Sequence, residues 1–306
     1  MPLDYSCGDD EEPPLLIWVA THCCYDWSDM GSKGGWTGTG TIPLLTYPYH
    51  AKKIRPHIIV SECTSGFDIT VWKRVLGNGY TVLSRKMNSA DQGIPMLRPR
   101  LYTISISDET LNNEEPFDDS AKFDVLFGRS LQLTGEVFLQ ATAQERRREV
   151  ERLGGQRPHA IEDMSEVLLR TALKPGTAIR LEGYAAIAKL SDIKSKLPTL
   201  IASIAQEPTE RMSVNSLVPT LLRESILVLI KSDALNIGEG SEQLMLGGEH
   251  LAAMGWPIYQ VNLRCAIRDA LPSLSEPAKR TLTGDGLCIP QIGCVILFAL
   301  ASNARV

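Results

Sequence analysis

The sequence lacks the features of a membrane protein, a secreted disulfide scaffold or a uniformly basic protein. None of its apolar runs approaches the roughly 20 residues that a membrane-spanning helix needs. Its seven cysteines are odd in number and have no paired zinc-ligand spacing, which favours a reducing compartment. The first 12 residues are acidic, unlike a secretory signal peptide. A net charge of −5 excludes a surface coated in basic residues, but it does not exclude one basic cleft.

What is present is enough apolar sequence for a packed core, since 43% of the 306 residues are hydrophobic. An apolar run at residues 15–20 is typical of a buried parallel strand, and a polar loop with Cys23 and Cys24 follows it. Ligands of open α/β sheets sit past the carboxyl ends of strands, so a thiol there is a candidate reactive group. The alternative is that both cysteines are small buried hydrophobes.

Further along, the pattern alternates between short strands and helices. We expect a helix from Pro43 to Arg55 and another over residues 67–76, with strands at residues 57–60, 80–83 and 101–106. Residues 107–119 are acidic and irregular, residues 144–153 indicate an exposed helix, and an apolar helix follows Pro290. The signals between residues 160 and 206 are too mixed to assign.

Several separated blocks occur in one order along this framework. They are Cys24-Tyr-Asp-Trp27-Ser28, Glu62-Cys63-Thr64, Gly79-Tyr80, Gly93-Ile-Pro95-Met-Leu-Arg98-Pro-Arg100, residues 249–257 and residues 284–293. In this order they resemble the DNA (cytosine-5) methyltransferases, over residues 15–106 and 205–300. The chain departs from the family pattern at five positions: Cys23, Cys63, Met96, Ala252 and Asp285.

The resemblance implies a partial doubly wound, Rossmann-like α/β sheet with a smaller inserted target-recognition domain. On this basis we expect a catalytic domain over residues 1–106, the recognition domain over residues 107–274, and a return to the catalytic domain over residues 275–306. The variable middle would choose the target sequence, which the chain does not reveal.

The resemblance also assigns catalytic roles. Cys24 would add to carbon 6 of cytosine, and Glu62 would hydrogen-bond the base edge and protonate ring nitrogen 3. Arg100 would reach toward the base and the thiolate, and Arg98 would hold the catalytic loop or a phosphate. The alternatives are an exposed strand-end carboxylate for Glu62 and a solvated strand edge for the arginines. A base in a duplex must be flipped out to reach such a site.

Double-stranded DNA is the implied partner, and its candidate contacts are Ser28, Lys33, Arg146 and Arg147. For the arginines, a solvated helix face with pairs four residues apart is the favoured alternative. No membrane partner is expected. We expect the nucleus if the cell is eukaryotic, and the cytoplasm otherwise.

The implied cofactor is S-adenosyl-L-methionine, with Asp285 and Gly286 as its candidate contacts. The family begins with a strand and a Phe-x-Gly-x-Gly loop that hold this cofactor, and neither is found here. We therefore expect the cofactor half to come from a missing N-terminal segment or a partner, leaving residues 15–20 as a bare, aggregation-prone edge. Two other hypotheses stay open: a non-catalytic DNA-binding or regulatory remnant, and an RNA cytosine-5 methyltransferase.

Overall fold

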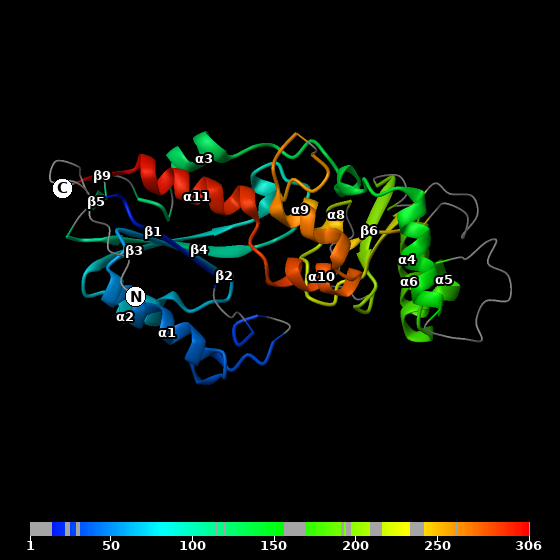
Figure 1. The fold of residues 1–306 in the computed structure, drawn as a ribbon, viewed down its shortest axis with the longest axis horizontal. Helices are drawn as coiled ribbons and strands as arrows, with labels where there is room; N and C mark the ends of the chain where they lie inside the picture. The colour runs from blue at the N-terminus through cyan, green and yellow to red at the C-terminus, as the bar shows by residue number, and fades with distance from the viewer. Residues whose placement is uncertain are drawn as a thin grey trace. The chain divides into compact units, whose positions relative to one another are not determined.

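The computed structural model describes residues 14–21, 25–28, 31–109, 111–113, 116–118, 120–155, 169–190, 193, 197–208, 216–232, 242–260 and 262–305. The chain divides into two compact units (Figure 1). The first comprises Met1–Met87, Pro99–Phe127 and Gln291–Val306, and the second comprises Asn88–Arg98 and Gly128–Pro290. The expected boundaries after residues 106 and 274 are therefore not those of the structure, where the chain passes between the units after Met87, Arg98, Phe127 and Pro290.

The first unit contains a four-stranded mixed sheet in the part of the chain that the structure describes. Its strands are β1 (Ile17–Thr21), β2 (Ile58–Thr64), β3 (Tyr80–Met87) and β4 (Arg100–Ser107), in the order β1-β2-β4-β3. β1 and β2 are parallel, whereas β4 runs antiparallel to both of its neighbours. Every residue of β2 and β4 is buried, including polar and charged residues such as Glu62 and Arg100.

Helices cover both faces of this sheet (Figure 1), which confirms the α/β class. On one face, α1 (Thr41–Ile54) and α2 (Ile69–Leu76) contribute Leu44 and Trp72 to a core with Ile59 of β2. On the other face lie α3 (Ala121–Phe127) and α11 (Ile289–Ala301), joined by edge-on packing of Phe123 on Phe298. A short antiparallel ladder pairs β5 (Leu111–Asn113) with β9 (Asn303–Arg305).

The second unit is built around an antiparallel sheet of β6 (Thr199–Ser203), β7 (Leu227–Lys231) and β8 (Glu242–Leu244). Alternate residues of β7 enter different cores: Val228 and Ile230 face one, and Leu229 faces the other. The helices are α4 (Ala143–Gly155), α5 (Leu169–Ala172), α6 (Pro175–Ala188), α8 (Gly247–Ala253), α9 (Ala266–Ala270) and α10 (Glu276–Asp285). Short 3₁₀ turns of this unit are η2 (Ser89–Asp91), η3 (Gly135–Phe138) and η5 (Leu271–Ser273), whereas η1 (Gly35–Thr37) belongs to the first unit.

Residues 88–98 belong to the second unit although they connect two strands of the first. The amide of Leu97 donates to the carbonyl of Val218 at 2.8 Å, and the amide of Val218 donates to Pro95 at 3.0 Å. Met96 is fully buried in the second unit's core. These contacts explain why residues 88–98 belong to the second unit. From their place in the sequence, between β3 and β4, they would be assigned to the first unit.

One stretch, Glu276–Ala301, is long and apolar enough to cross a membrane by length and composition. It comprises two helices, α10 and α11, with residues 286–288 between them. Phe298 of α11 is buried against Phe117 and Phe123. The test considers only length and hydropathy, and an apolar helix that packs on a sheet passes it as well. The stretch is therefore only weak evidence for a membrane span.

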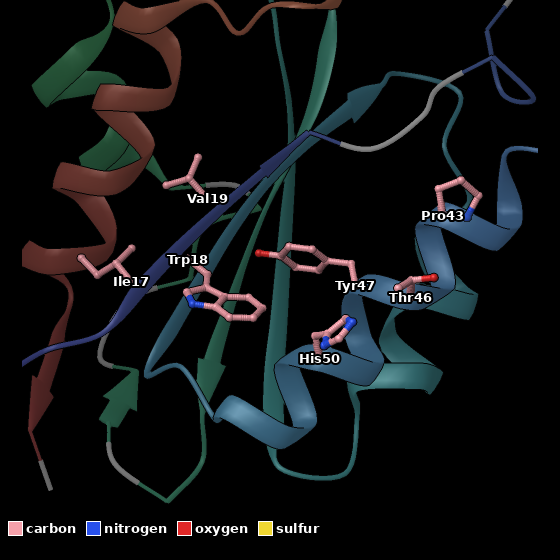
Figure 2. Close-up of a pocket in the computed structure, with 7 residues that line it drawn as sticks. All are labelled: Ile17, Trp18, Val19, Pro43, Thr46, Tyr47 and His50. Atoms are coloured by element: carbon pink, nitrogen blue, oxygen red, sulfur yellow. The ribbon is translucent and has the colours of Figure 1, made fainter. Parts of the chain in front are cut away.

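β1 forms an edge of the sheet among the described residues, since it pairs there with β2 only. Val19 on this strand is 44% exposed. A hollow of about 510 Å³ lies between β1 and α1, where the rings of Trp18 and Tyr47 face each other at 5.4 Å (Figure 2). Burial raises the pKa of Tyr47, so its phenol stays neutral. The edge and the hollow are both apolar.

Candidate active site

Glu62 and Arg100 form a buried ion pair at the end of β2. In the β2–β4 register Glu62 lies opposite Tyr102 and Arg100 lies opposite Thr64, so the two charged side chains are diagonal neighbours on one sheet face. Arg100 Nε donates to Glu62 Oε1 at 2.8 Å, and the side chains are 10% and 6% exposed. A buried charge needs such a partner. Neither side chain is therefore an ordinary solvated strand-end group.

The end of β1 adjoins this pair. Thr21, the last residue of β1, is the register partner of Glu62. The segment that carries Cys24 leaves the sheet after Thr21 and re-enters the described chain at Tyr25. Cys23 and Cys24 themselves lie outside the described residues, so the meeting of the Cys24 thiol with Glu62 stays a prediction.

The segment that follows Cys24 packs beside the exit of β2. The ring of Trp27 lies edge-on at 5.1 Å from both Trp36 and Phe67. A Cβ on Gly66 would lie 2.8 Å from the carbonyl oxygen of Trp27, so glycine permits this close approach. The sequence analysis missed the anchoring roles of Trp36 and Phe67, and aromatic residues next to glycines are the signal that could have indicated them.

Two predicted DNA contacts lie in the same region. Ser28 is partly exposed, and its carbonyl accepts the amide of Gly31 at 3.0 Å. Lys33 is exposed and has a left-handed backbone with φ of 55°. Their positions beside the Cys24 segment are compatible with nucleic-acid contacts, which stay a prediction.

Arg98 belongs to the second unit. Its side chain is buried, its amide donates to Asn88 Oδ1 at 2.8 Å, and Arg98 Nη2 donates to the carbonyl of Gly286 at 2.8 Å. Gly286 is the C-cap of α10. Arg98 thus holds the end of α10 within the second unit, and its contact with the catalytic loop or a phosphate stays a prediction.

The arginines of α4 also differ from each other. The Arg146 side chain is 13% exposed and Glu249 is fully buried; Arg146 Nη1 donates to Glu249 Oε2 at 2.8 Å and to the carbonyl of Leu244 at 2.6 Å. This geometry argues against the predicted DNA contact of Arg146. The Arg147 side chain is 58% exposed and pairs with Glu151 at 2.9 Å, as expected for a solvated helix face.

The predicted cofactor contacts do not fit S-adenosylmethionine. Arg223 Nε donates to Asp285 Oδ1 at 2.6 Å, and the remaining charge of this carboxylate would repel the cofactor's own carboxylate. The amide of Gly286 donates to Thr283 at 3.3 Å, and its carbonyl is held by Arg98. Within the described residues, no cluster of His, Cys, Asp and Glu could hold a metal ion.

Comparison with known proteins gives matches in structure only. No protein-family model and no curated protein sequence matches the chain. The S. pombe Dnmt2 methyltransferase aligns over 94% of this chain and 77% of its own, with 15% identity and a TM-score of 0.52. The Entamoeba histolytica methyltransferase EhMeth aligns over 94% and 77%, with 11% identity and a TM-score of 0.54. The chain therefore has the fold of these two methyltransferases.

Proposed function

We propose that the chain is a DNA (cytosine-5) methyltransferase in which Cys24 is the nucleophile and the Glu62–Arg100 pair holds the base. The ordered sequence blocks and the methyltransferase fold support the family. The single observation that carries the chemistry is the buried ion pair at the carboxyl end of β2, next to the end of β1. Perturbed or paired charges at such a sheet edge are typical of functional sites.

The chemistry requires both an anion and an acid. Carbon 5 of cytosine is a poor nucleophile, and addition of the Cys24 thiolate to carbon 6 converts the ring to an enamine that can attack a methyl group. In its protonated form, Glu62 would hydrogen-bond the edge of the flipped base and give its proton to nitrogen 3, becoming the carboxylate that pairs with Arg100. Arg100 holds the Glu62 carboxylate in one orientation. S-adenosylmethionine is the proposed methyl donor, and no step is assigned to Asp285 or Gly286.

Trapping on duplex DNA that contains 5-fluorocytosine tests this proposal, because fluorine at carbon 5 blocks release of the enzyme. We expect a denaturation-resistant complex whose crosslinked peptide contains Cys24. Cys24→Ser should abolish the complex, whereas Cys294→Ser on α11 is the matched cysteine control. Glu62→Gln should slow its formation by about 100-fold. Absence of a complex in the presence of bound cofactor would contradict catalysis and favour the non-catalytic remnant.

Substrate and cofactor supply are separate questions. An RNA duplex of the same sequence, carrying 5-fluorocytosine, distinguishes the RNA methyltransferase from the DNA enzyme. Calorimetric titration of S-adenosylmethionine into the folded chain tests whether the chain binds its cofactor alone. Lack of saturable binding would favour a partner or an upstream segment that completes the site. A DNA substrate also implies the nucleus in a eukaryote and the cytoplasm otherwise.

A further inference from the structure

Asp26, two residues after Cys24, has a carboxylate that is buried inside a glycine-rich loop. The residue is 2% exposed. Its Oδ1 accepts the hydroxyl of Ser32, its Oδ2 accepts the amide of Gly40 at 2.7 Å, and its main-chain carbonyl accepts the amide of Gly35 at 2.9 Å. Residues 32–40 therefore wrap around one side chain. The sequence analysis missed this residue.

The glycines of this loop are needed for space. A Cβ added to Gly38 would lie 2.0 Å from Asp26 Cγ, closer than any real contact, although the φ of Gly38 is an ordinary −76°. A Cβ on Gly34 would lie 3.4 Å from Asp26 Oδ1. The carboxylate of Asp26 therefore occupies the space that a side chain at position 38 would need, and the loop can pack on it only with glycine there.

The carboxylate also ties this loop to a rigid helix. Gly40 is the N-cap residue of α1 and has no side chain to cap it. Asp26 accepts the amide of this N-cap residue, as the N3 carboxylate of a capping box does, and a negative charge at a helix N-terminus is favourable. α1 is in turn fixed to the sheet by Leu44 and Ala51, which are buried in the core. Asp26 therefore links the segment after Cys24 to the body of the first unit.

We propose that Asp26 is the positioning residue of the Cys24 segment. Its carboxylate anchors the residues just after Cys24 to the N-terminus of α1, and the packing of Trp27 on Phe67 is the second anchor. Loss of this anchor would displace the residues that follow Cys24, and misplacement of a reacting group by about 1 Å costs up to about 100-fold in rate. This role rests on the proposed function through the identity of Cys24 as nucleophile.

The test compares Asp26→Ala, Asp26→Asn and Gly38→Ala in the full chain. Asp26→Ala and Gly38→Ala should each lower the rate of 5-fluorocytosine complex formation by about 10- to 100-fold at saturating DNA, with little change in DNA affinity. Asp26→Asn should stay within about threefold of the parent, since its amide oxygen can still accept from Gly40 and its NH₂ can donate to Ser32. Thr39→Val, at another exposed position of the loop, is the matched control.

A double variant separates positioning from general destabilisation. Because Gly38→Ala acts by striking Asp26, adding Asp26→Ala should cost no more than either change alone. Additive losses, or an Asp26→Asn variant as slow as Asp26→Ala, would overturn the proposal.

Amide hydrogen exchange of residues 35–40 tests whether Asp26 holds this loop, and it does so without any measurement of catalysis. Asp26→Ala should expose these amides to exchange, and Asp26→Asn should keep them protected. Unchanged protection in Asp26→Ala would also overturn the proposal. If the parent protein forms no complex with DNA, the proposed function fails while these exchange data still decide the role of Asp26.

Discussion

Arg146 and Arg147 are adjacent on α4, yet the structure predicts opposite outcomes for their replacement. Arg146 makes two hydrogen bonds to the fully buried Glu249 and donates to the carbonyl of Leu244. Replacing it with Met would leave the Glu249 carboxylate buried without its cation. Arg147 pairs with Glu151 across the exposed face of the helix.

The magnitudes follow from burial. Removing one partner of a buried ion pair costs about 3–5 kcal/mol, and Arg146→Met falls at the lower end because the amides of Ala141 and Leu246 still donate to Glu249. An exposed pair four residues apart contributes at most about 0.5 kcal/mol, so Arg147→Met should be close to neutral.

Urea-induced unfolding followed by circular dichroism measures this difference. The double variant Arg146→Met/Glu249→Gln should recover part of the loss, because the amide carries no charge that needs a cation. Equal losses for Arg146→Met and Arg147→Met would refute the reasoning, and so would a double variant no more stable than Arg146→Met. Arg147→Met should meanwhile reduce the salt dependence of DNA binding if its side chain contacts a phosphate.

Three further predictions concern single positions. Burial lowers the pKa of His250 from 6.5 to about 3. Between pH 6.5 and pH 3, the imidazole is therefore protonated in the unfolded chain but neutral in the folded chain. Stability should fall as the pH falls across this window, and His250→Leu should flatten that slope in urea titrations. Gly255→Ala should cost about 2 kcal/mol or more, because φ is 84° and the Cβ would lie 2.3 Å from Pro290; a thermal melt with unchanged Tm would refute it. Val19→Lys should reduce aggregation in light scattering by placing a charge on the β1 edge.

Much of the first unit could be predicted from local pattern. The apolar runs at residues 15–20, 57–60, 80–83 and 101–106 became β1 to β4, and the helices expected after Pro43 and after Pro290 are α1 and α11. Short apolar runs bounded by turn residues are sufficient for such assignments, because the signal of a strand lies within a few consecutive residues. The order β1-β2-β4-β3 is a property of strand pairing, which no local pattern reveals.

The candidate site shows the same division. The sequence by itself singled out Glu62 and Arg100 as candidate site residues at strand ends, because the motifs that contain them are local. Only the tertiary structure decided that they form one buried pair, and that Arg98, two residues away, holds Gly286 at a separation of 188 positions. It also decided that Arg146 is bound to Glu249, 103 positions away, and that Asp26 lies inside a glycine loop. The physical reason is that burial and pairing depend on partners distant in sequence, whose register and packing no local pattern encodes.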